Sequence, residues 1–525
     1  MKAVKQSLVQ LLGKEYMDAV TAGAALLTDL SAEAAAGIAD DVIEFLPDAV
    51  MELTNRYLDQ VGTSVVPALN AVMNGAPTDA FHKAANRNAS PLGGLGFLRL
   101  GEDGKLYLTA KSEHYHTSLG HNFPGYKLID HARALGITNA THNNTRGYIT
   151  RLLERELIRT ANGLGRKEVR ELDNILDSRE PHVLNRVINL ETGTLACEAG
   201  IKMMLARFYR LDATFPAPKY EGRTPVFFVM GDHNGGGQAN YHGTTIYAQL
   251  LRDMWPGMYE KLEQEGALKV CTVTINDIND FRTKLEQFNK PPFKVAGFLH
   301  EIILMNYGGI KLEEAFLQQA YSLCHEQDVP IMCDEIQSCM WYPGMYLFKE
   351  YGLNPDIVVI GKGFPGGQYP ASRVITTAEM DTLNQFGALV TNGQEELAAL
   401  AYLVTMKFAE ENAPYVARMG AYYENKLREL GSKYPDLIER IEGKGHLSTI
   451  FFHDADAAIA FTRKMNERCI DISAQTYKAN CPPAALTKPP ITATKEMFEY
   501  LLRKMDEALN TITLWGNTDE RSEDG

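Results

Sequence analysis

The chain has 525 residues, of which 45% are hydrophobic and 22% are charged, proportions that are ordinary for a globular protein with a sizeable core. This length is too great for a single hydrophobic core and predicts a large domain with at least one smaller one. The formal net charge is −14 and no basic run could follow a phosphate backbone, which argues against a nucleic-acid partner.

The sequence also argues against a membrane or secreted protein. No stretch approaches the roughly 18 to 20 uninterrupted apolar residues of a membrane span. Lys14 and Glu15 interrupt the first apolar run before it reaches the length of a signal segment. The seven cysteines form no C-x-x-C pair, so we expect free thiols in a reducing compartment, without disulfides or a metal site. We therefore expect a cytoplasmic protein.

Residues 1–94 are predicted to form a helical extension. Ser31 stands in the N-cap position of a helix that reaches Ala39, with Glu33 in its first turn. Apolar residues then recur at roughly helical spacing over 41–57, which indicates packing against a neighbouring surface. Beyond this region, Asp103-Gly104 predicts a hairpin turn between two short strands.

A small-residue turn follows a strand predicted over 186–190. The turn is Thr192-Gly193-Thr194, and it opens a helix. Free backbone N–H groups and the helix dipole make such a turn a ready anion site, although on these residues alone an ordinary N-cap explains it as well. A second strand, 226–230, leads into a glycine-rich loop and Tyr241-His242; the loop lacks the G-K-[ST] ending of a phosphate-binding P-loop.

Two further apolar runs, 330–336 and 356–360, have the character of buried strands. The first delivers Asp334 and the second delivers Lys362, which lies between two glycines. Neighbouring parallel strands end at the same edge of a sheet, so we expect both side chains to project into one crevice. A buried ion pair is the simplest explanation of these two residues taken alone.

Taken together, these motifs resemble the class III aminotransferases, a family of fold type I pyridoxal phosphate enzymes. DEIQ (334–337), YGLNPDIVVIGKG (351–363) and GGQYPAS (366–372) are similar to the family's D-E-V-Q, G-x-x-P-D-I, x-K-G and G-x-P. TGTLACEAGIK (192–202) aligns without a gap with S-G-T-E-A-N-E-A-A-I-K. The resemblance spans roughly residues 95 to 510, and its motifs occur in the family's order.

The resemblance implies pyridoxal 5'-phosphate as the cofactor and assigns two catalytic residues. Lys362 would carry the cofactor as a Schiff base and move the substrate proton, and Asp334 would keep the pyridine nitrogen protonated. Thr391 would reach the phosphate of the neighbouring subunit, which implies a homodimer with a shared site. The remaining implied cofactor contacts, which surround the phosphate and the ring, are Gly193, Thr194, Tyr241, His242, Glu301 and Gln337.

The implied fold class is α/β, with a mainly parallel sheet between helices. We expect a helical N-terminal extension (1–94), a large cofactor-binding domain (95–400), a smaller α+β C-terminal domain (401–515) and a disordered tail (516–525).

The expected activity is transfer of an amino group from an amino acid or amine to a keto acid or aldehyde. A lyase, decarboxylase or racemase on the same scaffold is the alternative, and a catalytically silent relative is a third, disfavoured by the intact Lys362 and Asp334. The substrate stays open, because Leu486 and Lys488 stand where the family often carries a carboxylate-binding arginine. His114, Tyr115 and His116 correspond to the family's substrate entrance.

Overall fold

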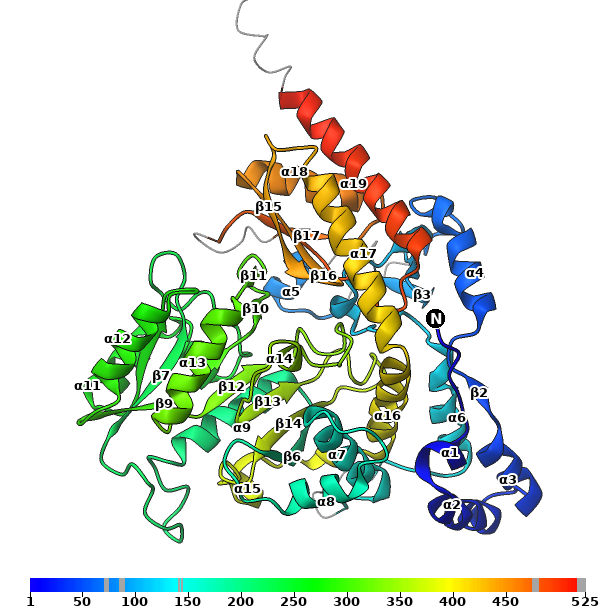
Figure 1. Ribbon diagram of the computed structural model, residues 1–525. Helices are drawn as coiled ribbons and strands as arrows, with labels where there is room; N and C mark the ends of the chain where they lie inside the picture. The colour runs from blue at the N-terminus through cyan, green and yellow to red at the C-terminus, as the bar shows by residue number, and fades with distance from the viewer. Residues whose placement is uncertain (70–74, 85–89, 140–141, 143–144, 475–480, 517–525) are drawn as a thin grey trace, which may run out of the picture.

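The computed structural model describes residues 1–69, 75–84, 90–139, 142, 145–474 and 481–516 (Figure 1). Its N-terminal part is mainly helical, as predicted, and Ser31 caps a helix by accepting a hydrogen bond from the Ala34 amide at 3.1 Å. One short antiparallel strand pair was not predicted. The elements are β1 (Lys5–Gln6), α1 (Leu8–Leu12), α2 (Lys14–Leu27), α3 (Ala32–Asp40), β2 (Ile43–Glu44), α4 (Asp48–Arg56) and α5 (Asp79–Ala84).

A three-stranded antiparallel sheet connects this part to the main body. It consists of β3 (Pro91–Leu95), β4 (Leu98–Gly101) and β5 (Leu106–Leu108). The predicted hairpin turn lies between β4 and β5, where Gly104 has a φ of +75°. A side chain at this position would be strained by that backbone conformation, which explains the glycine.

A seven-stranded sheet forms the centre of the molecule. Its strands lie in the order β6 (Leu184–Leu190), β14 (Ser372–Thr377), β13 (Ile357–Ile360), β12 (Ile331–Asp334), β9 (Phe293–His300), β7 (Thr224–Met230) and β8 (Lys269–Val273). The pairs from β13 to β8 are parallel, whereas β14 runs antiparallel to both of its neighbours. The sheet is thus mainly parallel, as expected.

Both faces of this sheet are covered, which is why its strands read as continuous apolar runs. Val358 and Ile360 of β13 belong to one buried cluster, and Ile357 and Val359 belong to another on the opposite face. The helices of this region are α6 (Lys127–Ala134), α7 (Tyr148–Ala161), α8 (Val169–Asp177), α9 (Gly193–Leu205), α10 (Ile246–Leu250), α11 (Pro256–Gln264), α12 (Ile278–Phe288), α13 (Glu314–Glu326), α14 (Leu347–Glu350), α15 (Gln385–Ala388) and α16 (Glu396–Glu411).

A smaller four-stranded antiparallel sheet with its own buried cluster lies above the large one in Figure 1. Its strand order is β15 (Ile438–Lys444), β16 (Leu447–Phe452), β18 (Ala484–Thr487) and β17 (Ser473–Ala474). Three helices accompany it: α17 (Ala413–Gly431), α18 (Ala455–Glu467) and α19 (Lys495–Gly516). The antiparallel pair β10 (Ile303–Leu304) and β11 (Ile310–Lys311) follows β9 in the chain, and β11 contacts β15 of the smaller sheet.

Among the described helices, none combines the length and apolar character needed to cross a membrane. The expectation of a disordered tail concerns residues 516–525; α19 ends at Gly516, and 517–525 lie outside the described residues.

Candidate active site

A cavity of about 210 Å³ lies at the carboxyl edge of the central sheet, and both residues of the predicted catalytic pair line it. Asp334 is the last residue of β12, and Lys362 follows β13 by two positions. The strands are neighbours and parallel, with Asp334 opposite Val359. The cavity is lined by His116, Glu191, Thr192, Gly193, Thr194, Cys197, Tyr241, His242, Gly243, Asp334, Ile336, Gln337, Lys362, Pro370, Ala371 and Ser372.

The Asp334 carboxylate is held by three donors. One oxygen accepts hydrogen bonds from His242 Nδ1 at 2.8 Å and from the Cys197 thiol at 3.2 Å, and the other accepts the Ile336 amide at 3.1 Å. Burial and the Asp334 charge raise the pKa of Cys197 well above its ordinary value, so the thiol stays protonated and can donate. The carboxylate is 4% exposed and therefore fixed in orientation toward the cavity.

Lys362 lies in a tight turn that larger neighbours could not form. Its own φ is +39°, in the left-handed region. A side chain on Gly363 would come within 2.7 Å of the Trp341 ring, and the Gly363 carbonyl accepts a hydrogen bond from Ser118 Oγ at 2.6 Å. The turn is thus packed against Trp341 and tied to a distant segment.

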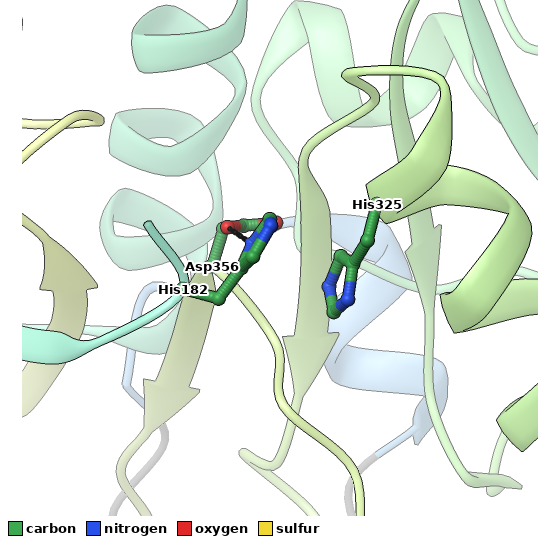
Figure 2. Close-up of side chains that lie close together, drawn as sticks. All are labelled: His182, His325 and Asp356. Carbon is green, nitrogen blue, oxygen red and sulfur yellow. Dashed lines mark hydrogen bonds and ion pairs between the residues drawn. The ribbon is translucent and has the colours of Figure 1, made fainter. Parts of the chain in front are cut away.

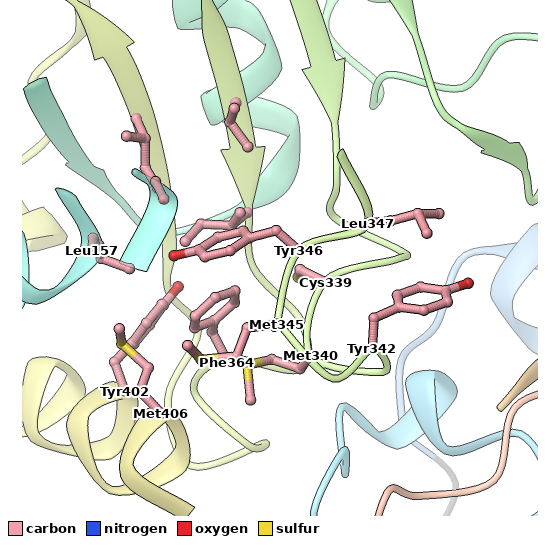
Figure 3. Close-up of a cluster of buried hydrophobic side chains, with 14 of the residues drawn as sticks. Leu157, Cys339, Met340, Tyr342, Met345, Tyr346, Leu347, Phe364, Tyr402 and Met406 are labelled. Atoms are coloured by element: carbon pink, nitrogen blue, oxygen red, sulfur yellow. The ribbon is translucent and has the colours of Figure 1, made fainter. Parts of the chain in front are cut away.

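Aromatic packing around Phe364, two residues after Lys362, supports the same turn. Phe364 stacks on Tyr402 of α16 with ring centroids 5.4 Å apart and lies 5.5 Å from Tyr346 (Figure 3). Tyr402 also donates a hydrogen bond to the carbonyl of Ala371, a residue that lines the cavity, at 3.1 Å. Buried rings in fixed contacts restrict the position of the Lys362 backbone.

The start of α9 forms a second wall. Thr192 caps the helix by accepting the Leu195 amide at 3.3 Å, and Gly193 begins it. A side chain on Gly193 would lie 2.8 Å from Ile336. Gly243 has a φ of +103°, and a side chain there would lie 2.7 Å from Thr194. The glycines therefore let three segments meet around the free amides of a helix N-terminus.

Most of the predicted contacts are brought together, but two are not. Gly193, Thr194, Tyr241, His242 and Gln337 line the cavity, as does His116 from the predicted substrate entrance. Neither Glu301 nor Thr391 is among the described residues that line the cavity. Glu301 is buried just after β9, and Thr391 is exposed in a short 3₁₀ turn, Thr391–Gln394.

Sequence reasoning did not assign side-chain roles to three residues of this cavity: Glu191, Cys197 and Ser372. Cys197 stands where the family motif has asparagine, and only its spacing, one helical turn after Gly193, hinted that it faces the same wall. Glu191 precedes the turn at the end of β6, and its Oε2 is buried without a hydrogen-bond partner in the described part of the chain. Ser372 is the first residue of β14, and no sequence pattern predicted that this strand pairs antiparallel to its neighbours.

A buried group of charges lies next to the cavity without lining it. Lys488 donates to the Gln337 carbonyl and lies 4.0 Å from the centre of the Trp341 ring. Burial lowers the pKa of Lys488 to about 8. The Glu113 carboxylate opposes this shift, and the positive charge of Lys362 adds to it. Burial also lowers the pKa of Lys111, again opposed by Glu113. Two lysines thus share one buried carboxylate close to Lys362.

Comparison with known proteins agrees with this geometry. The family model described as aminotransferase class III matches residues 101–509. Putrescine aminotransferase from Pectobacterium atrosepticum is 28% identical over 246 residues, 46% of this chain and 52% of that protein. The chain therefore spans about half the length of this curated relative in the alignment.

Solved structures share the fold over most of the chain. Ornithine aminotransferase from Toxoplasma gondii superposes with a TM-score of 0.64 at 19% identity, covering 85% of this chain and 93% of that one. Adenosylmethionine-8-amino-7-oxononanoate aminotransferase from Methanocaldococcus jannaschii also gives 0.64 at 19% identity, covering 88% and 99%. At these identities the likeness establishes the architecture.

Proposed function

The chain belongs to the class III aminotransferase family, and from this membership we propose that it is a pyridoxal phosphate-dependent aminotransferase. It would transfer an amino group from an amino acid or amine to a keto acid or aldehyde. The observation that carries the proposal is the position of Asp334 and Lys362, which come from adjacent parallel strands of a fold type I sheet and line one cavity.

The residues present fit this cofactor. Gly193 and Thr194 line the cavity at the N-terminus of α9, where the backbone amides suit a phosphate, and Gly243 lets the loop before α10 approach Thr194 closely. Oδ1 of Asp334 accepts one hydrogen bond from the described residues, which leaves a lone pair for a protonated ring nitrogen. His242 Nε2 is buried without a partner among these residues, so a bound polar group can satisfy it.

When bound, pyridoxal phosphate supplies an electron sink for the pair of electrons left at the substrate carbon. The chain's own groups do the rest. Lys362 Nζ would hold the cofactor and, once released, move the proton at the substrate's alpha carbon. Asp334 would keep a proton on the ring nitrogen, and the three donors described above would keep its carboxylate turned toward the ring. Tyr241 would cover a ring face.

The charges near the cavity favour an anionic acceptor. Lys111, Lys362 and Lys488 face a single buried carboxylate, Glu113, so the local field is positive when the amines are protonated. Lys488 is fully buried and bound to the Gln337 carbonyl, so its amine would act on a substrate through its charge and not by direct contact. We infer that a keto acid is preferred over an aldehyde as the amino acceptor.

Two features support a homodimer with shared sites. Thr391 is exposed and does not line the cavity of its own chain, as expected if it completes the neighbour's site. Phe386, in α15 just before it, is 85% exposed and would be covered by such a contact. The free cysteines, six of them buried, suit a reducing compartment such as the cytoplasm.

A donor panel tests the proposed activity. The holoenzyme is mixed with single amino acids, including the diamino acid ornithine, and with the diamine putrescine, each with pyruvate or 2-oxoglutarate, and products are quantified by mass spectrometry. The proposal expects equal amounts of a carbonyl product from the donor and a new amino acid from the acceptor. Carbon dioxide, an eliminated group or an inverted enantiomer, without a new amino acid, would contradict it.

A further inference from the structure

A second cluster of ligand-type side chains lies at the opposite edge of the central sheet from the cavity. Asp356 immediately precedes β13, whereas Lys362 follows it. His182 comes from the loop before β6, and His325 comes from the last turn of α13. Figure 2 shows these three side chains reaching toward one another from separate segments. Nothing in the proposed amino transfer uses them.

The three side chains are close enough to share an ion once the imidazole rings reorient. One potential ligand atom from each lies within 4.8 Å of the others, and all three residues are within the described part of the chain. His182 Nδ1 and Asp356 Oδ1 are 2.7 Å apart. Ligands on one tetrahedral zinc ion, each about 2.0–2.2 Å from the metal, are separated by roughly 3.3 to 3.6 Å, so these two atoms need only move slightly apart to bind the same ion.

Asp356 is held by backbone contacts on both sides. Its Oδ2 accepts the Ile331 amide at 2.9 Å, and its own carbonyl accepts the Thr376 hydroxyl at 2.9 Å. The side chain is 7% exposed, and one oxygen is left facing His182. A ligand carboxylate that is oriented by an outer contact of this kind is typical of metal sites.

The two histidines have features that ordinary packing does not explain. His325 Nε2 is buried and has no hydrogen-bond partner among the described residues, which is a cost that a bound ion would remove. His182 has a φ of +60°, a left-handed conformation that is unusual outside glycine. Strained backbone and unpaired buried nitrogen thus occur within one small cluster.

The present ring positions define what binding would require. The imidazoles stack with centroids 3.7 Å apart and planes 25° apart. A metal lies in the plane of each imidazole that binds it, so the rings must tilt apart to share one ion. His325 is only partly buried at a helix end, so its ring can turn while Asp356 stays in place.

We propose that His182, His325 and Asp356 bind a zinc-type divalent cation, with a water molecule in the fourth position. Two imidazoles and one carboxylate are a donor set that suits Zn²⁺. A cavity of about 270 Å³, lined by His182, Lys349 and Asn354 among others, adjoins the cluster and offers a route for the ion. The ion would join the loop before β6, the end of α13 and the start of β13.

The test uses the pyridoxal phosphate-loaded enzyme, which keeps the other three-residue cluster, Cys197, His242 and Asp334, engaged in the active site. After removal of metals by chelation, Zn²⁺ binding is measured by titration calorimetry, and Co²⁺ is used as an absorbing substitute. We expect one ion per chain. His325→Gln and His182→Gln should each weaken binding at least tenfold, since loss even of an outer contact costs that much.

His453→Gln is the matched control, because His453 is an exposed histidine whose ring contacts only the Pro435 carbonyl at 2.8 Å among the contacts that the structure records. It should bind like the unmodified chain. Asp356→Asn would also disturb the backbone contacts of Asp356, so the test uses the two histidine variants instead. Absence of stoichiometric binding, or binding in both histidine variants as tight as in the unmodified chain, would overturn the proposal.

Discussion

In the proposed mechanism, Asp334 is the residue whose change by a single atom should lower activity most clearly. Asp334→Asn keeps the size of the side chain, yet it places an NH₂ group where the carboxylate now accepts from His242, Cys197 or the Ile336 amide. Losing the proposed charge-assisted bond to the ring nitrogen should lower kcat by several powers of ten, which corresponds to several kcal/mol. Steady-state kinetics at saturating cofactor measure this.

The control for that variant is Cys197→Ser, which retains a donor to the same oxygen. It should keep turnover within about tenfold of the unmodified enzyme, because a weak S–H bond is replaced by an O–H bond. If Asp334→Asn also stayed within about tenfold, Asp334 would not be the partner of the ring nitrogen.

Glu335 gives the stability of the protein a pH dependence that can be predicted in sign. Burial raises the pKa of Glu335 from 4.5 to about 7, although its carboxylate accepts the Phe348 amide at 2.6 Å. The folded chain therefore keeps this proton up to about pH 7, whereas the unfolded chain releases it near pH 4.5. The group's contribution is fully present below pH 4.5 and is lost as the pH rises to about 7.

Glu335→Gln should remove this loss, since an amide resembles the protonated acid. Relative to the variant, the unmodified chain should lose roughly 3 kcal/mol of unfolding free energy between pH 4.5 and pH 8, at about 1.4 kcal/mol per pH unit. Urea denaturation of both proteins at several pH values measures the difference. A difference that does not change with pH would mean that Glu335 is already ionised in the folded protein.

Some site residues could be predicted from the sequence and others could not, for a physical reason. Asp334 and Lys362 each end a strand, so local patterning places them at one sheet edge. Cys197 contacts Asp334 across 137 positions, and Lys488 contacts Gln337 across 151. Such contacts depend on how helices and the second sheet pack, which no local pattern encodes.

At the scale of elements, the meeting of α9 with the loop before α10 defines the proposed phosphate site. Gly243→Ala would add a carbon 2.7 Å from the Thr194 backbone at a φ of +103°. One of the two segments must move, so the cofactor dissociation constant should rise at least tenfold while the fold is retained. Fluorescence titration with pyridoxal phosphate measures this, with circular dichroism as a check on folding.

Gly257→Ala is the matched control for that prediction. Gly257 lies in the first turn of α11, and an added carbon there would meet nothing within 4 Å. The cofactor dissociation constant should stay unchanged, and stability should rise slightly because alanine favours helix more than glycine does. Unchanged affinity in Gly243→Ala as well would mean that this loop does not shape the phosphate site.

The elements themselves were largely predictable. The strands predicted over 186–190 and 226–230 lie within β6 and β7, and the helix predicted to follow Ser31 corresponds to α3, because each has an apolar pattern or a clear start signal. The short pairs β1–β2 and β10–β11 were not expected. Two-residue strands carry no periodicity, so only tertiary packing defines them.

At the scale of the whole molecule, the central question is whether two chains share each site. A hybrid of Thr391→Ala and Lys362→Ala subunits tests this. If Thr391 serves the neighbouring chain, one site of the mixed dimer carries both changes and the other carries neither. Mixing two poorly active parents should therefore restore up to half of the normal activity per mixed dimer.

Subunit exchange is verified by tagging the two variants differently and isolating the mixed dimer. Activity no higher than that of the parents in such a dimer would contradict a shared site.

The mainly parallel sheet with two covered faces was expected from the resemblance, whereas the division into domains at residues 94, 400 and 515 stays a prediction.

The most direct measurement for the whole account is the identity of the lysine that carries the cofactor. The holoenzyme is reduced with borohydride, digested and mapped by mass spectrometry. The account predicts that pyridoxal phosphate is fixed to Lys362, and that Lys362→Ala still binds the cofactor but loses catalysis almost completely. Label on a different lysine, or substantial turnover by Lys362→Ala, would contradict it.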